Sequence, residues 1–137
     1  MKYTGTFEVT MQAEPPYETV EGVALARAHF EKRFSGPLDA TSEVHMLSAR
    51  TAVPGSAGYV AIERVKGRLD GKEGTFVLQH SGVMTRGTPH LQVAVVPDSG
   101  TGELAGIAGE MEIRIDGGKH FYAFDVRLTT LESGSGS

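Results

Sequence analysis

Alternation of apolar and polar residues, interrupted at short intervals by glycine-containing turns, constrains this chain more than any other feature of its sequence. The 18 glycines are spread along the 137 residues, and most segments between them alternate with a period of two. One such segment places Met111, Ile113 and Ile115 on one face and charged residues on the other. No segment has helical periodicity. The pattern therefore predicts an all-β protein whose strands each have one apolar face.

Eight segments fit this description, and most are joined by tight turns. Strands are expected at about Thr4–Gln12, Ala24–Phe34, Leu38–Ala49, Tyr59–Leu69, Gly74–Met84, a strand that begins near Pro89, Gly109–Asp116 and a last strand from His120 to Leu128. The segment Tyr17–Glu21 is ambiguous between a loop and a short extension. Eight strands with one apolar face throughout predict an eight-stranded antiparallel up-and-down β-barrel, and a flat sandwich is the alternative.

Length and composition exclude several classes of protein. The length predicts one domain, placed at residues 1–130, and residues 131–137 are typical of a cloning scar and flexible linker. The absence of cysteine excludes disulfides and thiolate zinc sites. A net charge of −4 and a pI of about 5.7 argue against nucleic-acid binding. With no apolar run of membrane-spanning length and no signal peptide, we expect a cytoplasmic protein without membrane contact.

The hairpin between the fourth and fifth expected strands carries the most informative pair of residues. A two-residue turn with Gly71 as its first central residue places Asp70 opposite Glu73. In that register Glu63 lies directly opposite His80, on a face that is otherwise apolar or small. A carboxylate in an apolar interior is costly unless it is paired and hydrogen-bonded. The sequence therefore singles out Glu63 and His80 as the candidate catalytic pair.

Other inward-facing residues would bind a substrate or ligand around this pair. Burial raises a carboxyl pKa and a nearby cation such as Lys32 lowers it, so the balance could tune Glu63 for acid–base work. Tyr59, Tyr122 and His120 could donate hydrogen bonds to a developing oxyanion or enolate. The alternative is a structural polar network that fixes the register of the barrel. The expected substrate-binding residues are Lys32, Tyr59, Phe76, Leu78, Met84, Val93, Val95, His120, Tyr122 and Phe124.

A metal site is another interpretation of the interior histidines. Two histidines and one carboxylate form a known ligand set, and His80, His120 and Glu63 would supply it. The strands that carry the two histidines need not be neighbours, however, and their spacing has no metal-binding signature. We therefore expect neither a metal nor a cofactor. The other three histidines fall on outward faces and are expected to be surface residues: His29, His45 and His90.

The outward face of the central strands is more apolar than a barrel wall that meets water. An exposed apolar patch of this kind usually marks a partner surface, and we expect the chain to form a homo-oligomer through it. The alternative is that Tyr17–Glu21 or a terminus covers the patch. The expected contact residues are Val60, Ile62, Val77, Val83 and Val96.

Several blocks of the sequence resemble known barrel families. The segment Ser99–Gly109 resembles the Gly-Thr-Gly…Gly…Gly connection of the allene oxide cyclase and dirigent barrels. The blocks Gly58–Val65 and Gly74–Gly82, together with His120–Tyr122, resemble a family of small bacterial proteins of unknown function within the allene oxide cyclase-like superfamily. The resemblance extends over about Gly22–Leu128. It implies an allene oxide cyclase-like barrel that binds a small apolar or amphipathic molecule.

The resemblance also suggests a reaction class. The plant cyclases of this superfamily close a fatty-acid epoxide with a carboxylate and ordered water inside the barrel, and their key carboxylate lies near the first strand. The first-strand acid here, Glu8, alternates to the outside, so an acting interior carboxylate would be Glu63 from another strand. We expect a small-molecule-binding barrel that is either a cofactor-free isomerase or cyclase for a largely apolar substrate, or a non-catalytic ligand-binding or structural oligomeric barrel.

Overall fold

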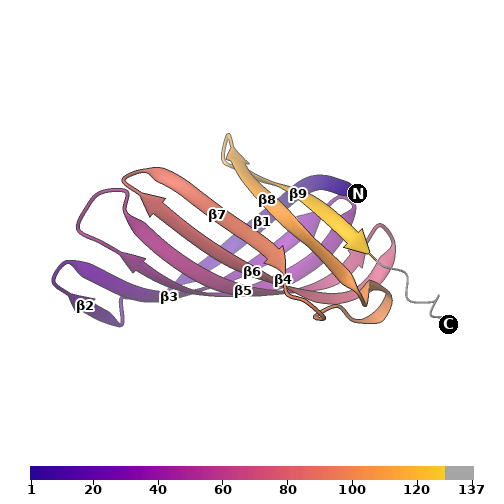
Figure 1. Cartoon of the computed structure of the whole chain (residues 1–137), viewed down its shortest axis with the longest axis horizontal. Coiled ribbons are helices and arrows are strands. Elements are labelled where there is room, and N and C mark those ends of the chain that lie inside the picture. Colours follow the sequence, from indigo (N-terminus) through magenta and orange to yellow (C-terminus); the bar gives the residue numbers. More distant parts are fainter. Residues whose placement is uncertain (129–137) are drawn as a thin grey trace.

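The computed structural model describes residues 1–128, and nine strands account for most of them (Figure 1). The strands are β1 (Lys2–Ala13), β2 (Glu18–Val20), β3 (Val23–Ser35), β4 (Leu38–Arg50), β5 (Ala57–Leu69), β6 (Lys72–Thr85), β7 (Thr88–Val95), β8 (Ile107–Asp116) and β9 (Lys119–Leu128). A single 3₁₀ turn, η1 (Gly102–Leu104), precedes β8. No helix in this part of the chain is long and apolar enough to cross a membrane. The expected linker at 131–137 lies outside the described residues.

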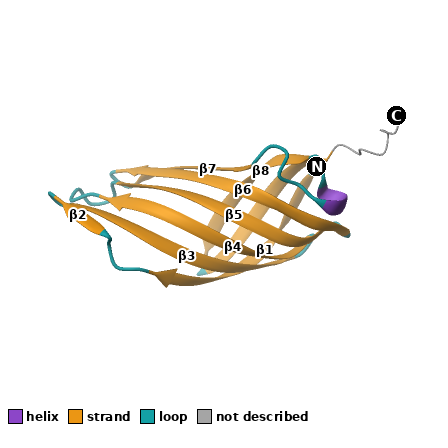
Figure 2. Cartoon of the chain, turned by 90° about the horizontal axis from the view of Figure 1, so that it is seen from below, coloured by secondary structure: helices purple, strands orange, loops and turns teal. Residues whose placement is uncertain are grey.

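Eight of the strands form a closed antiparallel barrel in chain order. β1 pairs with β9 on one side and with β3 on the other, which joins the two edges of the sheet. β2 pairs only with β3 and lies at the end of the molecule far from η1 (Figure 2). The predicted eight-stranded up-and-down barrel is therefore confirmed and the flat sandwich is wrong. The ambiguous segment Tyr17–Glu21 contributes the short strand β2 at one rim.

The seam between β7 and β8 is the weakest closure of this ring. Their register is limited to Ala94 opposite Glu110, whereas every other pair of ring neighbours has a longer ladder. Figure 1 shows the β8–β9 hairpin diverging from β7 beyond the point where they meet. One end of the barrel is thus less completely enclosed by hydrogen-bonded strands than the other.

A dense apolar core fills the end of the barrel that lies near the N-terminus. We call this part the filled end; its fully buried members include Phe34, Phe76, Phe124, Leu38 and Leu69. These residues occupy the inward positions of their strands, as the alternation in the sequence predicts. Burial of about 150–250 Å² by each aromatic side chain makes this cluster a major source of stability.

The hydroxyl group of Tyr122 links strands of the filled end by two hydrogen bonds. The N–H of Leu38 donates to this hydroxyl at 3.0 Å, and the hydroxyl donates to the carbonyl of Ser35 at 3.1 Å. The ring crosses the backbone of Gly5, where a Cβ would lie 2.5 Å from the hydroxyl oxygen. Gly5 is therefore required for this contact, which joins β9 to the β3–β4 connection across β1.

The β5–β6 register differs from the predicted one by two residues. Asp70 and Gly71 both have positive φ, of 51° and 81°, and form a type I′ turn that sets Leu69 opposite Lys72. The predicted turn was one residue later along the chain, so the expected placement of Glu63 directly opposite His80 is wrong. A shift of two residues preserves the inward face, because side chains alternate with a period of two. Glu63 and His80 therefore remain on the same face.

The β6–β7 hairpin has a turn of the same type. Arg86 and Gly87 have φ of 48° and 93° and set Thr85 opposite Thr88. His80 consequently faces Val93. Gly117 and Gly118 form the turn between β8 and β9 and also have positive φ. X-Gly turns with positive φ at both central residues thus determine the registers.

Candidate functional site

A polar network surrounds Glu63 in the middle of the barrel. The side chain of Glu63 is 0 % exposed. Its Oε1 lies 3.1 Å from Nζ of Lys32 and 2.7 Å from Nε2 of His80. Its Oε2 accepts a hydrogen bond from Oγ of Ser42 at 2.6 Å. One buried carboxylate thus bridges side chains from β3, β4 and β6.

The registers of three adjacent strands explain this convergence. Glu63 faces Val44 on β4 and Leu78 on β6. Ser42 lies two residues before Val44 and His80 two residues after Leu78, so both are diagonal neighbours of Glu63 on the inward face. Diagonal cross-strand neighbours remain within reach of long side chains. Glu63 and His80, which were expected to contact each other as directly opposed residues, make this contact as diagonal neighbours.

The charges of this network favour an ionised Glu63. Burial is the largest single influence and raises the pKa of Glu63, but the hydrogen bond from His80 and the positive charge of Lys32, together with Ser42, outweigh it. The net pKa of Glu63 is below its ordinary value. Lys32 also lies over the rings of Phe7 and Phe34, at 4.8 Å and 5.8 Å from their centroids. The expected counter-charge from Lys32 is therefore present.

The hydrogen bond from His80 defines the tautomer of its ring. An ionised carboxylate can only accept, so Nε2 of His80 carries the proton that points to Glu63. The other ring nitrogen, Nδ1, makes no hydrogen bond within residues 1–128, and the side chain of His80 is 5 % exposed. In a neutral imidazole this nitrogen is an acceptor. The bond to Glu63 thus fixes the orientation of the His80 ring, and Nδ1 is its one nitrogen without a hydrogen-bond partner in the described part of the chain.

The lowered pKa of Glu63 predicts how stability depends on pH. A carboxyl group with a depressed pKa in the folded state stabilises the fold above its unfolded-state pKa, and this contribution disappears as pH falls through the folded-state pKa. Starting from the ordinary value of 4.5, acidification should therefore reduce the free energy of unfolding more in the natural chain than in Glu63→Gln. Urea denaturation over a series of pH values measures this difference. Parallel pH profiles for the two proteins would contradict it.

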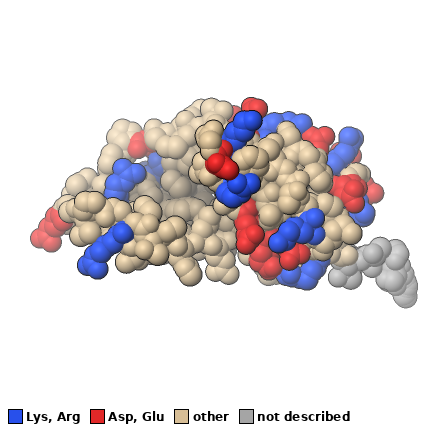
Figure 3. Space-filling model, turned by 90° about the horizontal axis from the view of Figure 1, so that it is seen from above, with Lys and Arg blue, Asp and Glu red and all other residues tan. Residues whose placement is uncertain are grey.

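The end of the barrel opposite the filled end begins next to the network, and side chains do not fill it. We call it the open end. Its inward positions leave four apolar side chains largely exposed: Met11 (56 %), Met84 (39 %), Leu91 (43 %) and Ile115 (66 %). A pocket of about 350 Å³ at this end is lined by residues that include Met46, Tyr59, Gly82, Met84 and Leu91. In Figure 3 the half of the molecule that contains this end is hollowed and carries few charged side chains, which gather over the other half.

Tyr59 connects the pocket with the polar network. Its ring lies over Gly82, directly opposite on β6, where a Cβ would be 2.3 Å from Cε1 of the ring. The next inward position on β6 is His80. Burial, and then the negative charge of Glu63, raises the pKa of Tyr59, so its hydroxyl stays protonated at neutral pH and can donate a hydrogen bond.

The predicted substrate-binding residues are divided between the two ends. Lys32, Tyr59 and Met84 lie at the network or at the open end. His120 is half-buried and packs against Phe7, with ring centroids 5.1 Å apart. The other predicted residues belong to the buried core: Phe76, Leu78, Val93, Val95, Tyr122 and Phe124.

The metal set that the sequence offered and that was not expected to form, His80, His120 and Glu63, is not among the possible ligand groups within residues 1–128. The structure instead brings His29, Glu43 and His45 together on the outside of the barrel. The sequence analysis missed this cluster and treated its histidines as surface residues; His45 is exposed, whereas His29 is half-buried. The available signal was that His29 and His45 are equally distant from Pro37, at the centre of the β3–β4 hairpin.

The expected apolar patch is only partly exposed. Val60, Ile62 and Val83 are exposed as predicted. Val77 and Val96 are half-buried, because the connection after β7 folds over them: the N–H of Val77 donates to Oγ of Ser99 at 3.0 Å. The exposed patch continues over β4 to Leu47, which faces Val60. The surface is therefore displaced toward the open end.

Together, the fold and the site define a class: closed antiparallel barrels, filled at one end and open at the other, with a buried Lys–Glu–Ser–His network between. The chain belongs to the family described as Protein of unknown function (DUF3224), whose model matches residues 3–126. Its structure is similar to that of a protein of unknown function from the DUF3224 family of Shewanella oneidensis MR-1. The two share 51% sequence identity and a TM-score of 0.89, over 94% of this chain and 98% of the other. No curated protein matches the sequence.

Proposed function

We propose that the barrel binds a small, largely apolar or amphipathic molecule in its open end, with the polar group of that molecule directed at the network. The observation that carries this proposal is the exposure of inward-facing apolar side chains at the open end, which Tyr59 and Gly82 separate from a fully buried carboxylate. Covering apolar surface contributes about 25 cal/mol per Å². A ligand that replaced water at Met84 and Leu91 would gain this free energy without any change in the filled end.

Polar groups at the pocket and in the network beyond it favour an oxygen-bearing polar end on the ligand; Tyr59 lines the pocket, whereas Lys32 and His80 belong to the network. Tyr59 and Lys32 are donors, because the hydroxyl stays protonated and the ammonium is positive. Nδ1 of His80 supplies the complementary acceptor. A carbonyl, hydroxyl or carboxyl group at the end of an apolar body matches this set, since binding sites combine apolar walls with a few placed polar groups.

A catalytic form of this proposal, a cofactor-free isomerase or cyclase, is favoured by the 2.7 Å contact between Glu63 and His80. All the side-chain hydrogen bonds of Glu63 within residues 1–128 come from protein donors, and its pKa is lowered, so Glu63 suits the role of a positioning and charge-stabilising group. His80 would then be the proton acceptor through Nδ1, with the resulting imidazolium stabilised by the carboxylate. The non-catalytic alternatives are a ligand-binding barrel and a structural barrel that acts through its outer patch.

Two further elements belong to the same proposal. The up-and-down order of eight strands supports membership of the allene oxide cyclase-like superfamily. The exposed patch of Leu47, Val60, Ile62 and Val83 supports a homo-oligomer. We further propose a cytoplasmic protein without nucleic-acid or membrane partners.

Native mass spectrometry of the protein purified from its host, followed by solvent extraction, tests ligand and oligomer together. The expected result is a retained small molecule that is released on denaturation, from a species that contains more than one chain. A spectrum with only ligand-free monomer would contradict retention of a ligand and a homo-oligomer, and would favour a structural role for the network. Fractionation of host cells tests the proposed location.

Leu91→Lys is expected to weaken binding of the neutral apolar dye Nile red at least about tenfold, because a charge in an apolar pocket must be desolvated when the dye enters. Leu91 lines the pocket and is partly exposed, so the lysine can reach water in the free protein. Gln92→Lys is the matched control, since Gln92 is the next residue on β7 and faces outward. Equal dye affinity for both variants would contradict binding at the open end.

A further inference from the structure

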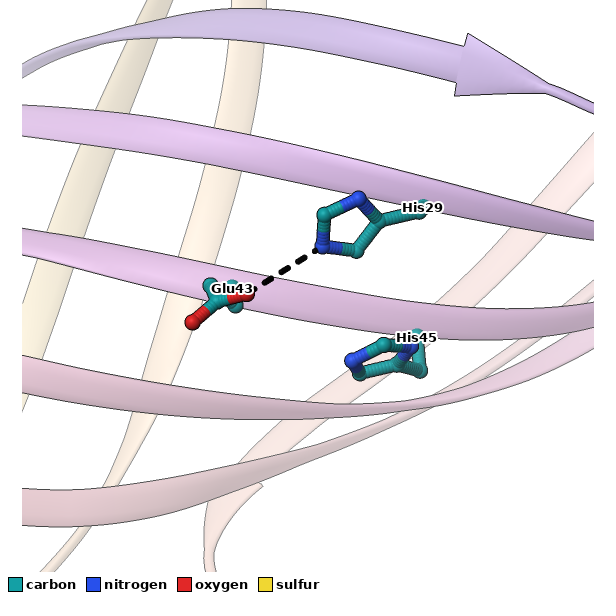
Figure 4. Close-up of side chains that lie close together, drawn as sticks. All are labelled: His29, Glu43 and His45. Carbon is teal, nitrogen blue, oxygen red and sulfur yellow. Dashed lines mark ion pairs between the residues drawn. The ribbon is translucent and has the colours of Figure 1, made fainter.

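We propose that the outer wall of the barrel carries a binding site for a divalent transition metal of the Zn²⁺ class, formed by His29, Glu43 and His45. The three side chains project from β3 and β4 toward the same region (Figure 4). The site lies on the outward face and is separate from the Lys32–Glu63–His80 network inside the barrel. It therefore does not depend on the function proposed above.

The β3–β4 register brings the three ligands together. His29 faces His45 across the two strands, and their ring centroids are 4.8 Å apart. Glu43 precedes His45 by two residues and so shares its face of the sheet. Its carboxylate lies 3.4 Å from Nε2 of His29. One ligand atom from each residue lies within 4.8 Å of the other two.

These separations are close to those of an occupied site. Zinc bonds of about 2.0–2.1 Å in tetrahedral geometry place neighbouring ligand atoms about 3.3 Å apart. His29 and Glu43 already have this spacing. His45 is exposed, so rotation of its side chain can close the remaining distance without displacing the backbone.

The hydrogen-bond pattern supplies a second, independent observation. Nε2 of His29 is the one buried side-chain polar atom that lacks a hydrogen-bond partner within residues 1–128. A buried polar atom without a partner is rare and costly, which makes it a position where an ion or another group is expected. A metal ion between His29 and Glu43 would provide the missing partner and satisfy the carboxylate as well.

Glu43 forms no ion pair with an arginine or lysine in the described part of the chain. Arg64 faces Glu43 across β4–β5, yet the ion pair with His29 is the only one that Glu43 makes in the described part of the chain. Arg27, on the same face of β3, is directed to Glu14 at 3.8 Å and lies over the ring of Tyr17. The carboxylate charge is therefore available to a bound cation.

The donor set determines the class of metal. Two imidazoles and one carboxylate suit Zn²⁺, Cu²⁺ or Ni²⁺, whereas Mg²⁺ and Ca²⁺ prefer oxygen-only sets. Three protein ligands leave a coordination position open to water or to another molecule. A pocket of about 440 Å³ beside the histidines is also lined by Leu47, Val60 and Ile62. A ligand atom at the open position would thus lie next to the apolar patch.

Isothermal titration of the metal-free, tag-free full chain with ZnCl₂ tests the proposal. We expect saturable binding of one Zn²⁺ per chain that excess Mg²⁺ does not compete away. His45→Ala and Glu43→Gln should each weaken this binding at least about tenfold, since even the partners that only orient ligands are worth that much. His90→Ala is the matched control, because His90 is an exposed histidine on β7, and it should bind zinc as the natural chain does.

Three results would overturn the proposal. They are an absence of saturable zinc binding, equal affinity in the natural chain and His45→Ala, or an equal loss in His90→Ala. Because His45 and Glu43 are exposed, their substitution should leave the circular dichroism spectrum unchanged, which separates loss of the site from loss of the fold.

Discussion

Replacing Glu63 with Gln is expected to lower the free energy of unfolding by about 3 kcal/mol, the range seen when one partner of a buried ion pair is removed. The amide keeps the shape of the side chain but removes the charge that Lys32 requires, and its NH₂ group is a donor that faces other donors. Unfolding in urea, followed by circular dichroism, measures the loss. The variant should still fold, because domains of this size are typically stable by about 5–15 kcal/mol.

Two companion variants make this prediction specific. Glu112→Gln removes an exposed, outward-facing carboxylate on β8 and should change stability by less than about 0.5 kcal/mol. Lys32→Met added to Glu63→Gln removes the uncompensated cation, and the double variant should regain part of the lost stability. A single Glu63→Gln change as mild as the control would show that the network contributes little to the fold. The double variant also separates the effect of charge from that of packing.

The second large effect is expected at Phe124, where truncation to Ala should lower the free energy of unfolding by about 3–5 kcal/mol. The Phe124 ring is fully buried and stacks on Phe76, with centroids 5.6 Å apart. Loss of the ring leaves a cavity in the filled end that the surrounding strands cannot close without breaking their pairing. Thermal and urea unfolding both report this change.

Phe121 supplies the matched control for this variant. It lies on the same strand but faces outward, where it packs under the guanidinium of Arg114 at 4.6 Å. Phe121→Ala should cost about 1 kcal/mol, the scale of a partly exposed cation–π contact and a small loss of buried area. If Phe124→Ala were instead mild but altered Nile red binding, Phe124 would be part of a ligand wall and not of the core.

Alternation alone identified which residues face inward, and therefore both the core and the polar side chains inside it. Phe34, Phe76 and Phe124 are buried where a period of two predicts them. Glu63 and His80 share the inward face even though the expected register was in error by two residues. Which residues of a strand face inward follows from the alternation in that strand alone, so an error of two residues in pairing does not change it.

The pairing itself required the backbone of the turns. An Asp-Gly pair is compatible with more than one two-residue turn, and the two choices differ by two residues in register. The observed positive φ of both Asp70 and Gly71 selects one of them. The four-residue network around Glu63 follows from that choice, because contacts between diagonal neighbours exist only in a defined register.

Properties of single strands could be predicted from the sequence, whereas the positions of the strands relative to one another could not. The sequence by itself determined the eight strands of the ring, the apolar face, the interior carboxylate and the outward position of His29, His45 and His90. Only the tertiary structure decided that the interior is filled at one end and open at the other, and that His29, Glu43 and His45 meet on the outer wall. Strand periodicity is a local property of the chain, whereas the spacing of side chains on different strands depends on ring closure and register.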